Sequence, residues 1–461
     1  MRVACRGMTD ALPLTRHRYD FNHPMAPAVV LAFTTCMTQF DVTAAAVALP
    51  EIRAELGFGA AGLAWVMDAY SLAFAGLLFL AGALADRFGR RRMLMLGNAG
   101  FALASLFCGL AWDGPSLWIA RALQGGASAF VITGSFASLS LCYPPSDGAS
   151  RARAFGIIGV TGGAAMALGP TLGGLVAAGI GWRWIFLVNL PLCALNVWLI
   201  LRVVTESKDQ SGRPLDPAGV ALLTLALALP VQAILQDGAA WQRGALVLAG
   251  IVCGGALLLQ QRKRTQPMLD PALFTRGPAI GIAILLICLS LGYWAVLVYL
   301  PLWLQTAYGL DTQQAGFAML ASTLPMLVLP PAGVWLIQRY GWRATFAGGL
   351  AMLAAGGALL ALTGVQKWDL SVALAAMTVA AAGAGISNPQ VSGALVALVR
   401  PDQAGMASAM ATVLRQASYA VGIALFGVLI RGDSFAPAFA AAALAAFVGA
   451  VAATLLLPRR M

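Results

Sequence analysis

Four charged side chains interrupt long apolar runs of the sequence. Asp41 lies in QFDVTAAAVALP, Asp68 in WVMDAYSLAFAG, Arg121 in LWIARALQGGASAF and Arg415 in ATVLRQASYAVG. On insertion scales, each charge costs about 2.5–3.5 kcal/mol at the centre of a membrane span. A charge kept at such a position is by default a candidate for ion or proton chemistry, so these four residues are the first candidates for a functional site.

Arg121 lies too deep in its apolar run to be a loop charge and needs a partner. A helix places Arg121, Gln124 and Gly125 on one face, and the glycine allows a second helix to approach closely. Asp41 is the expected partner. A carboxylate that separates from an arginine changes its preferred protonation state, which suits a proton-coupled process. A purely structural pair is the alternative, as is an outer-interface position for Asp68 and a structural interhelix bond for Arg415.

The elements that position these residues are membrane spans. The chain has 461 residues, of which 60% are hydrophobic and 10% charged, with a mean hydropathy of +0.81. Soluble domains are about a quarter charged. The sequence therefore predicts an all-α polytopic membrane protein. Its net charge of +11 is explained by loop charges that set membrane orientation, and no nucleic-acid partner is expected.

Reading hydropathy along the chain gives fourteen spans. They are expected near 26–49, 61–83, 93–112, 115–142, 154–179, 184–203, 217–236, 243–261, 277–305, 312–337, 344–364, 368–397, 404–430 and 436–458. Of the 29 lysines and arginines, 22 then fall on the side of the N-terminus and five on the opposite side. The positive-inside rule therefore predicts that both termini are cytoplasmic, with residues 1–25 as a polar tail.

Several chemistries are excluded by absence. The only histidines, His17 and His23, precede the first span, and none of the seven cysteines forms a Cys-x-x-Cys pair. No metal site or cofactor is expected. The three lysines, Lys208, Lys263 and Lys367, lie outside any phosphate-binding G-x-x-x-x-G-K-[ST] loop, so an ion gradient remains as the energy source.

Two loops of the first half recur in the second. GALADRFGRRRML at 82–94 resembles GVWLIQRYGWR at 333–343, and PPSDGASRA at 144–152 resembles RPDQAGMAS at 400–408. The similar offset predicts two six-helix bundles, 26–203 and 277–458. Residues 204–276 then form a linker with two inserted helices. Parallel six-span repeats with a substrate site between them build one large class of secondary transporters.

The fifth span is rich in glycine. GVTGGAAMALGPTLGGLV, at 159–176, contains the GxxxG pairs Gly159/Gly163 and Gly169/Gly173, with Pro170 inside the second pair. Small residues at this spacing let helices pack backbone to backbone, and the proline kinks the helix. The pattern predicts a bent, tightly packed helix at the interface of the two bundles.

Together these stretches resemble the major facilitator superfamily, and within it the fourteen-helix drug:proton antiporter branch of the EmrB/QacA type. The resemblance covers nearly the whole chain after residue 25. GALADRFGRRRML is similar to the loop 2–3 signature of the family. By this resemblance, the residues of a conformational switch are Gly82, Asp86, Arg87, Gly89 and Arg90. Gln338 replaces the aspartate in the second copy.

The same resemblance implies roles for residues inside the spans. DVTAAAVALP, with Asp41 and Pro50, resembles the span 1 signature, and RALQGG implies that Arg121 takes part in proton transfer. The fifth span resembles the antiporter signature that is typical of exporters. That signature includes Gly163, Gly169, Pro170 and Gly173.

Helices 7 to 14 depart from relatives that bind dications, because they carry almost no acidic residues within the spans; Asp237, Asp311, Asp369 and Asp433 fall at outer ends. This favours neutral or weakly charged hydrophobic substrates. A pocket with aromatic walls and a few polar anchors is expected. Its candidate residues are Gln39, Tyr70, Gln124, Tyr293, Trp294, Tyr299, Asn388 and Arg415, although plain helix packing is an alternative for each aromatic residue.

These observations predict a proton-coupled exporter of hydrophobic drugs or antibiotics in the bacterial inner membrane, which works by alternating access. Its expected partners are a small substrate, protons and the lipid bilayer. The alternative on the same fold is an exporter or importer of one metabolite or sugar. A membrane-embedded enzyme would need a larger soluble domain or a nucleophilic site. The sequence leaves open whether Asp41 or Asp68 carries the proton, and it does not define an oligomeric state.

Overall fold

The computed structural model describes residues 24–459 apart from 144–146, 209–214, 237, 265–266, 270–276, 367, 400–403 and 431–433. The predicted polar tail therefore lies almost entirely outside the described residues. Within these described residues, thirteen helices are long and apolar enough to cross a membrane, and a bent pair of helices makes up to fourteen. The prediction of an all-α polytopic membrane protein is confirmed.

The first seven helices build one bundle. They are α1 (Ala26–Leu56), α2 (Ala60–Phe88), α3 (Arg90–Gly109), α4 (Gly114–Cys142), α5 (Gly148–Ile180), α6 (Arg183–Leu187) and α7 (Asn189–Val203). The short α6 and the longer α7 together form the sixth span. Two further spans follow, α8 (Pro217–Leu235) and α9 (Ala240–Lys263).

The remaining helices build a second bundle. They are α10 (Gly277–Leu289), the π-helical segment η2 (Ser290–Trp294), α11 (Ala295–Tyr308), α12 (Thr312–Ala318), α13 (Leu320–Val328), α14 (Pro330–Tyr340), α15 (Trp342–Gln366), α16 (Leu370–Ala397), α17 (Ala404–Leu429) and α18 (Ala436–Leu456).

The tenth span differs from the continuous helix expected at 312–337. It is divided into α12, α13 and α14, and it bends by 46° before Pro330. Pro330 and Pro331 lack the backbone donors that a continuous helix needs, which explains the bend. The span count is thus confirmed only when this broken pair is taken as one crossing.

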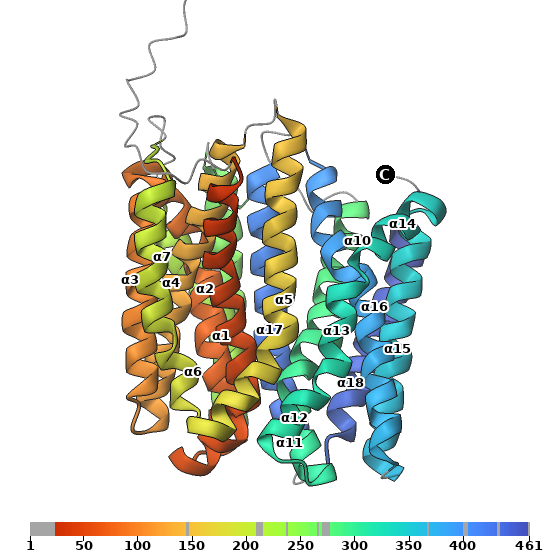
Figure 1. Ribbon diagram of the computed structural model, residues 1–461. Helices are drawn as coiled ribbons and strands as arrows, with labels where there is room; N and C mark the ends of the chain where they lie inside the picture. Colours follow the sequence, from red (N-terminus) through yellow and green to blue (C-terminus); the bar gives the residue numbers. More distant parts are fainter. Residues whose placement is uncertain are drawn as a thin grey trace, which may run out of the picture.

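The helices divide into two groups with α5 and α17 between them (Figure 1). In the first group α1 packs against α5, and α4 packs against α2 and α3; in the second, α15 packs against α16 and α18. The groups meet where α2 packs on α17, where α5 packs on α12 and α13, and where α1 packs on α11. The start of α1 and the end of α18 lie at the same end of the molecule, called here the terminal side.

The inserted helix α8 covers the seam between the bundles. It packs against both α2 and α17, whereas α9 packs on α8. Gly76 of α2 permits this contact, because a Cβ atom there would collide with Thr224 of α8. Only 17% of the most apolar window of α9 is buried, against 72% for α2, so α9 lies at the periphery.

The two repeated loops are held in the same way. Gly89 and Gly341 both end a helix with positive φ, +115° and +85°, a conformation that favours glycine. The next residue then donates its backbone N–H to the chain that follows the last helix of the same bundle: Arg90 to Ser207 (3.0 Å) and Trp342 to Arg459 (3.2 Å). This shared geometry supports the internal repeat inferred from the sequence.

Candidate functional site

The centre of the first bundle contains a fully buried ion pair. Asp41 of α1 and Arg121 of α4 are 0% exposed, and the Oδ2 atom of Asp41 lies 2.7 Å from Nη1 of Arg121. Arg121 lies about two turns inside the start of α4. The structure therefore brings together the two residues that the sequence analysis paired.

Two amides complete the coordination of the Asp41 carboxylate. Its Oδ1 atom accepts hydrogen bonds from Nε2 of Gln124 (2.9 Å) and Nδ2 of Asn189 (2.7 Å). Both amides also donate to Oγ of Ser105, at 2.8 and 3.3 Å. Four helices thus contribute to one polar network. The carboxylate therefore accepts from three donors, one of which is a charged guanidinium group.

Close packing of α4 against α2 positions the guanidinium group. A Cβ atom at Gly125 would collide with the carbonyl oxygen of Tyr70, so only glycine permits this distance. Nε of Arg121 then donates to the carbonyl oxygen of Val66 at 3.0 Å, and its Cζ atom lies 4.5 Å from the centre of the Tyr70 ring and 5.7 Å from that of Phe186. Backbone, aromatic and charged contacts therefore hold Arg121 in one orientation.

Asp68 is placed differently from Asp41. It lies on α2, which forms the seam with α17, and it is fully buried. Neither carboxylate oxygen has a hydrogen-bond partner among the described residues. Tyr299 and Tyr419 of the second bundle lie near the Asp68 carboxylate. Burying an unpaired ionised carboxylate is so costly that such a group holds a proton instead.

The predicted pocket residues separate into two groups. Tyr70, Gln124, Tyr293 and Tyr299 are buried. Three of them make local hydrogen bonds through the hydroxyl group: Tyr70 with Ser128 (2.5 Å), Tyr293 with the carbonyl oxygen of Ser322 (2.5 Å) and Tyr299 with that of Ile423 (2.6 Å). Gln39, Trp294, Asn388 and Arg415 remain partly exposed.

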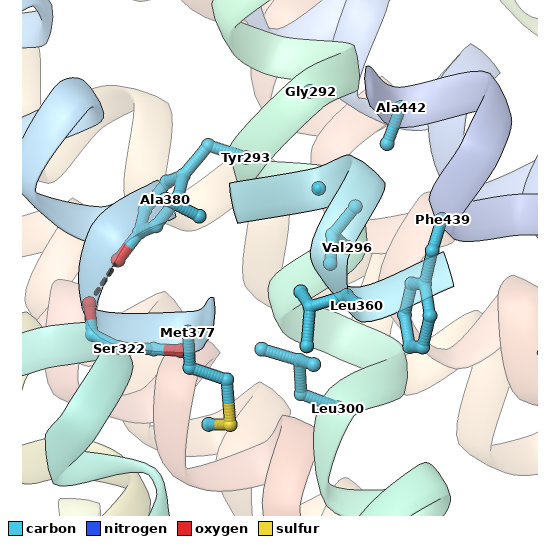
Figure 2. Close-up of a pocket in the computed structure, with 11 residues that line it drawn as sticks. Gly292, Tyr293, Val296, Leu300, Ser322, Leu360, Met377, Ala380, Phe439 and Ala442 are labelled. Atoms are coloured by element: carbon cyan, nitrogen blue, oxygen red, sulfur yellow. Dashed lines mark hydrogen bonds between the residues drawn. The ribbon is translucent and has the colours of Figure 1, made fainter. Parts of the chain in front are cut away.

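Tyr293 also lines a small pocket inside the second bundle (Figure 2). Its walls come from η2, α11, α13, α15, α16 and α18, and they are apolar apart from Tyr293 and Ser322. The pocket adjoins the π-helical segment, a feature that is frequent at functional sites. Because it lies within one bundle, it is separate from the space between the two.

One face of α5 changes from exposed to buried along its length. Arg153, Gly156 and Val160, which lie toward the terminal side, are exposed, whereas Ala167 and Thr171 are buried. These positions share one face at helical spacing. The buried part contacts the second bundle, since Thr171 donates to the carbonyl oxygen of Gly316 at 2.9 Å and Thr323 donates to that of Ala167 at 2.8 Å.

The same change occurs on α17. Ser408 is exposed, and Thr412 and Arg415 are partly exposed, whereas the next residues on that face, Tyr419 and Ile423, are buried. On both helices, the exposed positions therefore lie toward the terminal side and the buried ones toward the other side. The region lined by these exposed positions is called the vestibule, and it is defined by Arg153, Gly156 and Val160 of α5 and by Ser408, Thr412 and Arg415 of α17.

The glycines of α5 do not act alike. A Cβ atom at Gly173 would lie 2.7 Å from both Cα and Cβ of Ala44, and one at Gly169 would collide with Thr43. At Gly163 the nearest atom, in Leu327, would be 3.7 Å away, and at Gly159 no atom lies within 4 Å. The Gly169/Gly173 pair thus packs α5 against α1, while Pro170 lies inside the helix between them.

The loop between α2 and α3 is held within the first bundle. Asp86 accepts a hydrogen bond from Nη2 of Arg90 at 2.8 Å, Arg87 lies over the ring of Phe88, and no atom lies within 4 Å of a Cβ added at Gly82. The residue that the sequence analysis missed is Glu206, after α7. Its carboxylate accepts the backbone N–H groups of Arg91 and Arg92, each at 3.2 Å. Glu206 therefore caps the start of α3.

We expect Glu206→Ala to destabilise this loop. Loss of a helix N-cap costs roughly 0.5–2 kcal/mol, so the protein in detergent should unfold at a lower temperature. Arg92→Ala is the control, because its side chain is 64% exposed and makes only a 3.8 Å ion pair with Glu206. Equal melting temperatures for Glu206→Ala and wild type would show that the cap does not stabilise the fold.

Three network members, Asn189, Ser105 and the carbonyl of Val66, also escaped the sequence analysis. An asparagine within the apolar run IFLVNLPL is a recognisable signal, since amides are expensive in a span. A second buried cluster has the same signature: Nδ2 of Asn196 donates to Oδ1 of Asn98 at 2.7 Å, and Thr34 donates to Asn196 at 3.0 Å. Serines and backbone carbonyls carry no such signal.

Comparison with known proteins agrees with this architecture. The family model described as Major Facilitator Superfamily matches residues 31–273 and 282–461. The chain is also similar in structure to a peptide transporter, POT, in complex with sulfate, with a TM-score of 0.71, 16% identity and 94% of each chain covered. At this identity, the structural likeness concerns the fold alone.

Several bacterial proteins are similar to this chain in sequence. The multidrug resistance protein Stp of Mycobacterium tuberculosis is 32% identical, over 85% of this chain and 73% of that protein. The methylenomycin A resistance protein of Streptomyces coelicolor is 30% identical, over 93% and 91% of the two chains. The cephamycin export protein CmcT of Amycolatopsis lactamdurans is 33% identical, over 89% and 86%.

Proposed function

Since this chain belongs to the major facilitator superfamily of membrane transporters, we propose that it is a proton-coupled exporter of hydrophobic drugs or antibiotics. Two relatives are named for resistance to drugs or to an antibiotic, and a third is named for export. The observation that carries the proposal is the buried Asp41–Arg121 pair, joined by Gln124 and Asn189.

The two buried carboxylates have different roles in this proposal. Asp41 pairs with Arg121, whereas Asp68 holds a proton because no described residue donates a hydrogen bond to its carboxylate. Movement of α2 against α17 changes the surroundings of Asp68, and movement of α1 against α4 changes the distance between Asp41 and Arg121. Either change shifts the balance between the ionised and the protonated carboxyl. Transport is therefore coupled to proton movement at the seam.

The terminal side is the cytoplasmic side in this proposal, and the membrane is the bacterial inner membrane. Twenty-two of the 29 basic residues are expected on that side, in agreement with the positive-inside rule. The vestibule then opens to the cytoplasm, where an exporter loads its substrate. Alternating access closes the vestibule and separates the contacts of α5 with α12 and α13. The energy comes from the proton gradient, without a cofactor.

Efflux from everted membrane vesicles tests this function. A panel of fluorescent hydrophobic compounds and antibiotics is measured with and without an uncoupler. Uncoupler-sensitive transport of several unrelated compounds supports a multidrug exporter. Transport of a single compound supports the narrower metabolite exporter. Transport that is indifferent to the uncoupler would contradict proton coupling.

We expect Asp68→Asn to fold normally but to lose uncoupler-sensitive efflux. Asparagine has the size of a protonated aspartate, so a residue that is neutral in this conformation is replaced at little cost in stability. It cannot release a proton, so the coupled cycle stops while substrate binding remains. Efflux and binding are measured on the same preparations. Full coupled efflux by Asp68→Asn would show that Asp68 does not carry the coupled proton and would leave Asp41 as its only carrier in this proposal.

A further inference from the structure

Arg415 is a cation without a counter-ion. It is the twelfth residue of the 26-residue helix α17, and it makes no hydrogen bond or ion pair with any described residue. The side chain lies deep in the protein but keeps part of its surface accessible, on the vestibule face of α17. An arginine at this depth is costly unless water or an anion reaches it.

The described residues of the second bundle supply no partner. Its helices from Gly277 to Leu456 contain no acidic residue, because the acids of this half lie in the connecting segments. In the first bundle, Asp41 already pairs with Arg121 and accepts hydrogen bonds from two amides. Asp68 is neutral by the argument above and lies near Tyr419, one turn beyond Arg415 on the buried part of the face. The six residues that define the vestibule therefore carry a net positive charge, from Arg153 and Arg415.

The indole of Trp294 lies farther along α17 than this charge. A Cβ atom at Gly422 would lie 2.7 Å from Cβ of Ala295, so Trp294 is near the level of Gly422. That level is two turns, or about 10 Å, beyond Arg415 along α17. Trp294 is partly exposed, and its indole N–H donates to Oδ1 of Asn388 at 3.3 Å. The amide N–H groups of Asn388 make no bond with a described residue and can donate to a ligand.

We propose that Arg415 binds the anionic group of the exported compound, so that the preferred substrates are hydrophobic organic acids with an aromatic body about 10 Å from a carboxylate or phenolate. The inference rests on the proposed function, because it names the substrate class of that transporter. Arginine is suited to this role, since its guanidinium binds a carboxylate through two parallel hydrogen bonds. A positive vestibule also raises the local concentration of anions.

Binding of three pyrene derivatives tests the inference. The probes are pyrenebutyrate, pyrenebutanol and pyrenebutyl-trimethylammonium, which share one aromatic body and differ in charge. Fluorescence titrations use the full chain in nanodiscs of zwitterionic lipid, with empty nanodiscs as the blank. We expect the wild-type protein to bind pyrenebutyrate at least about tenfold more tightly than pyrenebutanol, and the cation most weakly, as is typical of a charge-assisted hydrogen bond.

Variants of Arg415 separate charge recognition from structure. Arg415→Gln should weaken the binding of pyrenebutyrate to the level of pyrenebutanol and leave the binding of pyrenebutanol unchanged. Arg415→Lys should retain part of the preference, and Arg415→Glu should favour the cationic probe. Arg339→Gln removes a charge elsewhere in the second bundle and should behave as wild type.

The opposite results would overturn the inference. One such result is a wild-type protein that binds all three probes equally or binds none of them. Another is an Arg415→Gln variant that keeps the preference for pyrenebutyrate or that loses binding of all three probes together. Vesicle efflux keeps the two proposals apart. Uncoupler-sensitive export of a cationic dye without binding of pyrenebutyrate would leave the transporter standing and remove Arg415 as an anion site. A clear preference for pyrenebutyrate without any coupled export would support Arg415 as an anion site and contradict the proposed proton-coupled exporter.

Discussion

Asp41→Asn is expected to abolish uncoupler-sensitive efflux and to lower the stability of the protein by about 3–5 kcal/mol. The substitution leaves Arg121 buried without a counter-ion, and breaking a buried pair from one side carries a cost of this size. The NH2 group of the new amide must also face either Arg121 or the pair of Gln124 and Asn189, all of which are donors at this position. Transport is measured in everted vesicles, and stability by thermal unfolding in detergent.

A double variant separates the loss of function from the loss of stability. Asp41→Asn combined with Arg121→Gln removes both charges, so it should recover much of the stability lost in the single variant. It should not recover transport, because neither the acid nor its partner remains. Coupled efflux by either variant would remove Asp41 from the coupling mechanism and move attention to Asp68.

Gly173→Ala is expected to reduce both stability and transport, with a destabilisation of roughly 1–3 kcal/mol. The added methyl group would lie 2.7 Å from Cα and Cβ of Ala44 and 3.1 Å from its carbonyl oxygen. Backbone cannot move aside as the end of a flexible side chain can, so α1 and α5 must separate. Asp41 is only three residues from Ala44, and the displacement would therefore reach the ion pair.

Gly159→Ala is the matched control in the same helix. No atom lies within 4 Å of the added methyl group, and alanine favours a helix by about 1 kcal/mol relative to glycine. The control should therefore be as stable as wild type or more stable, with normal transport. A Gly173→Ala protein that melts and transports like Gly159→Ala would show that the α1–α5 contact is not close in the working protein.

The sequence alone determined the number and position of the spans, because hydropathy is a property of each segment and does not depend on its neighbours. The sequence also determined the turns at Gly89 and Gly341, because the positive φ at these positions favours glycine. It also identified Asp41, Arg121, Asp68 and Arg415, since a charge in an apolar run is visible without any knowledge of packing.

The broken tenth span shows the limit of that reasoning. Pro330 and Pro331 were visible in the sequence, but hydropathy averages over such a break. The choice between the glycine pairs of α5 was also undetermined, because Gly159 and Gly173 have the same spacing to their partners. Only the approach of α1 distinguishes them.

Tertiary structure decided which of the four charges are satisfied. Asp41 is held by residues of two other helices, Asp68 lies at the seam with no donor among the described residues, and Arg415 faces the vestibule. The physical reason is that a hydrogen bond requires atoms within about 3 Å in a suitable direction. Such distances depend on how each helix is rotated and how closely it packs, and these are set by contacts between segments that are far apart in the sequence.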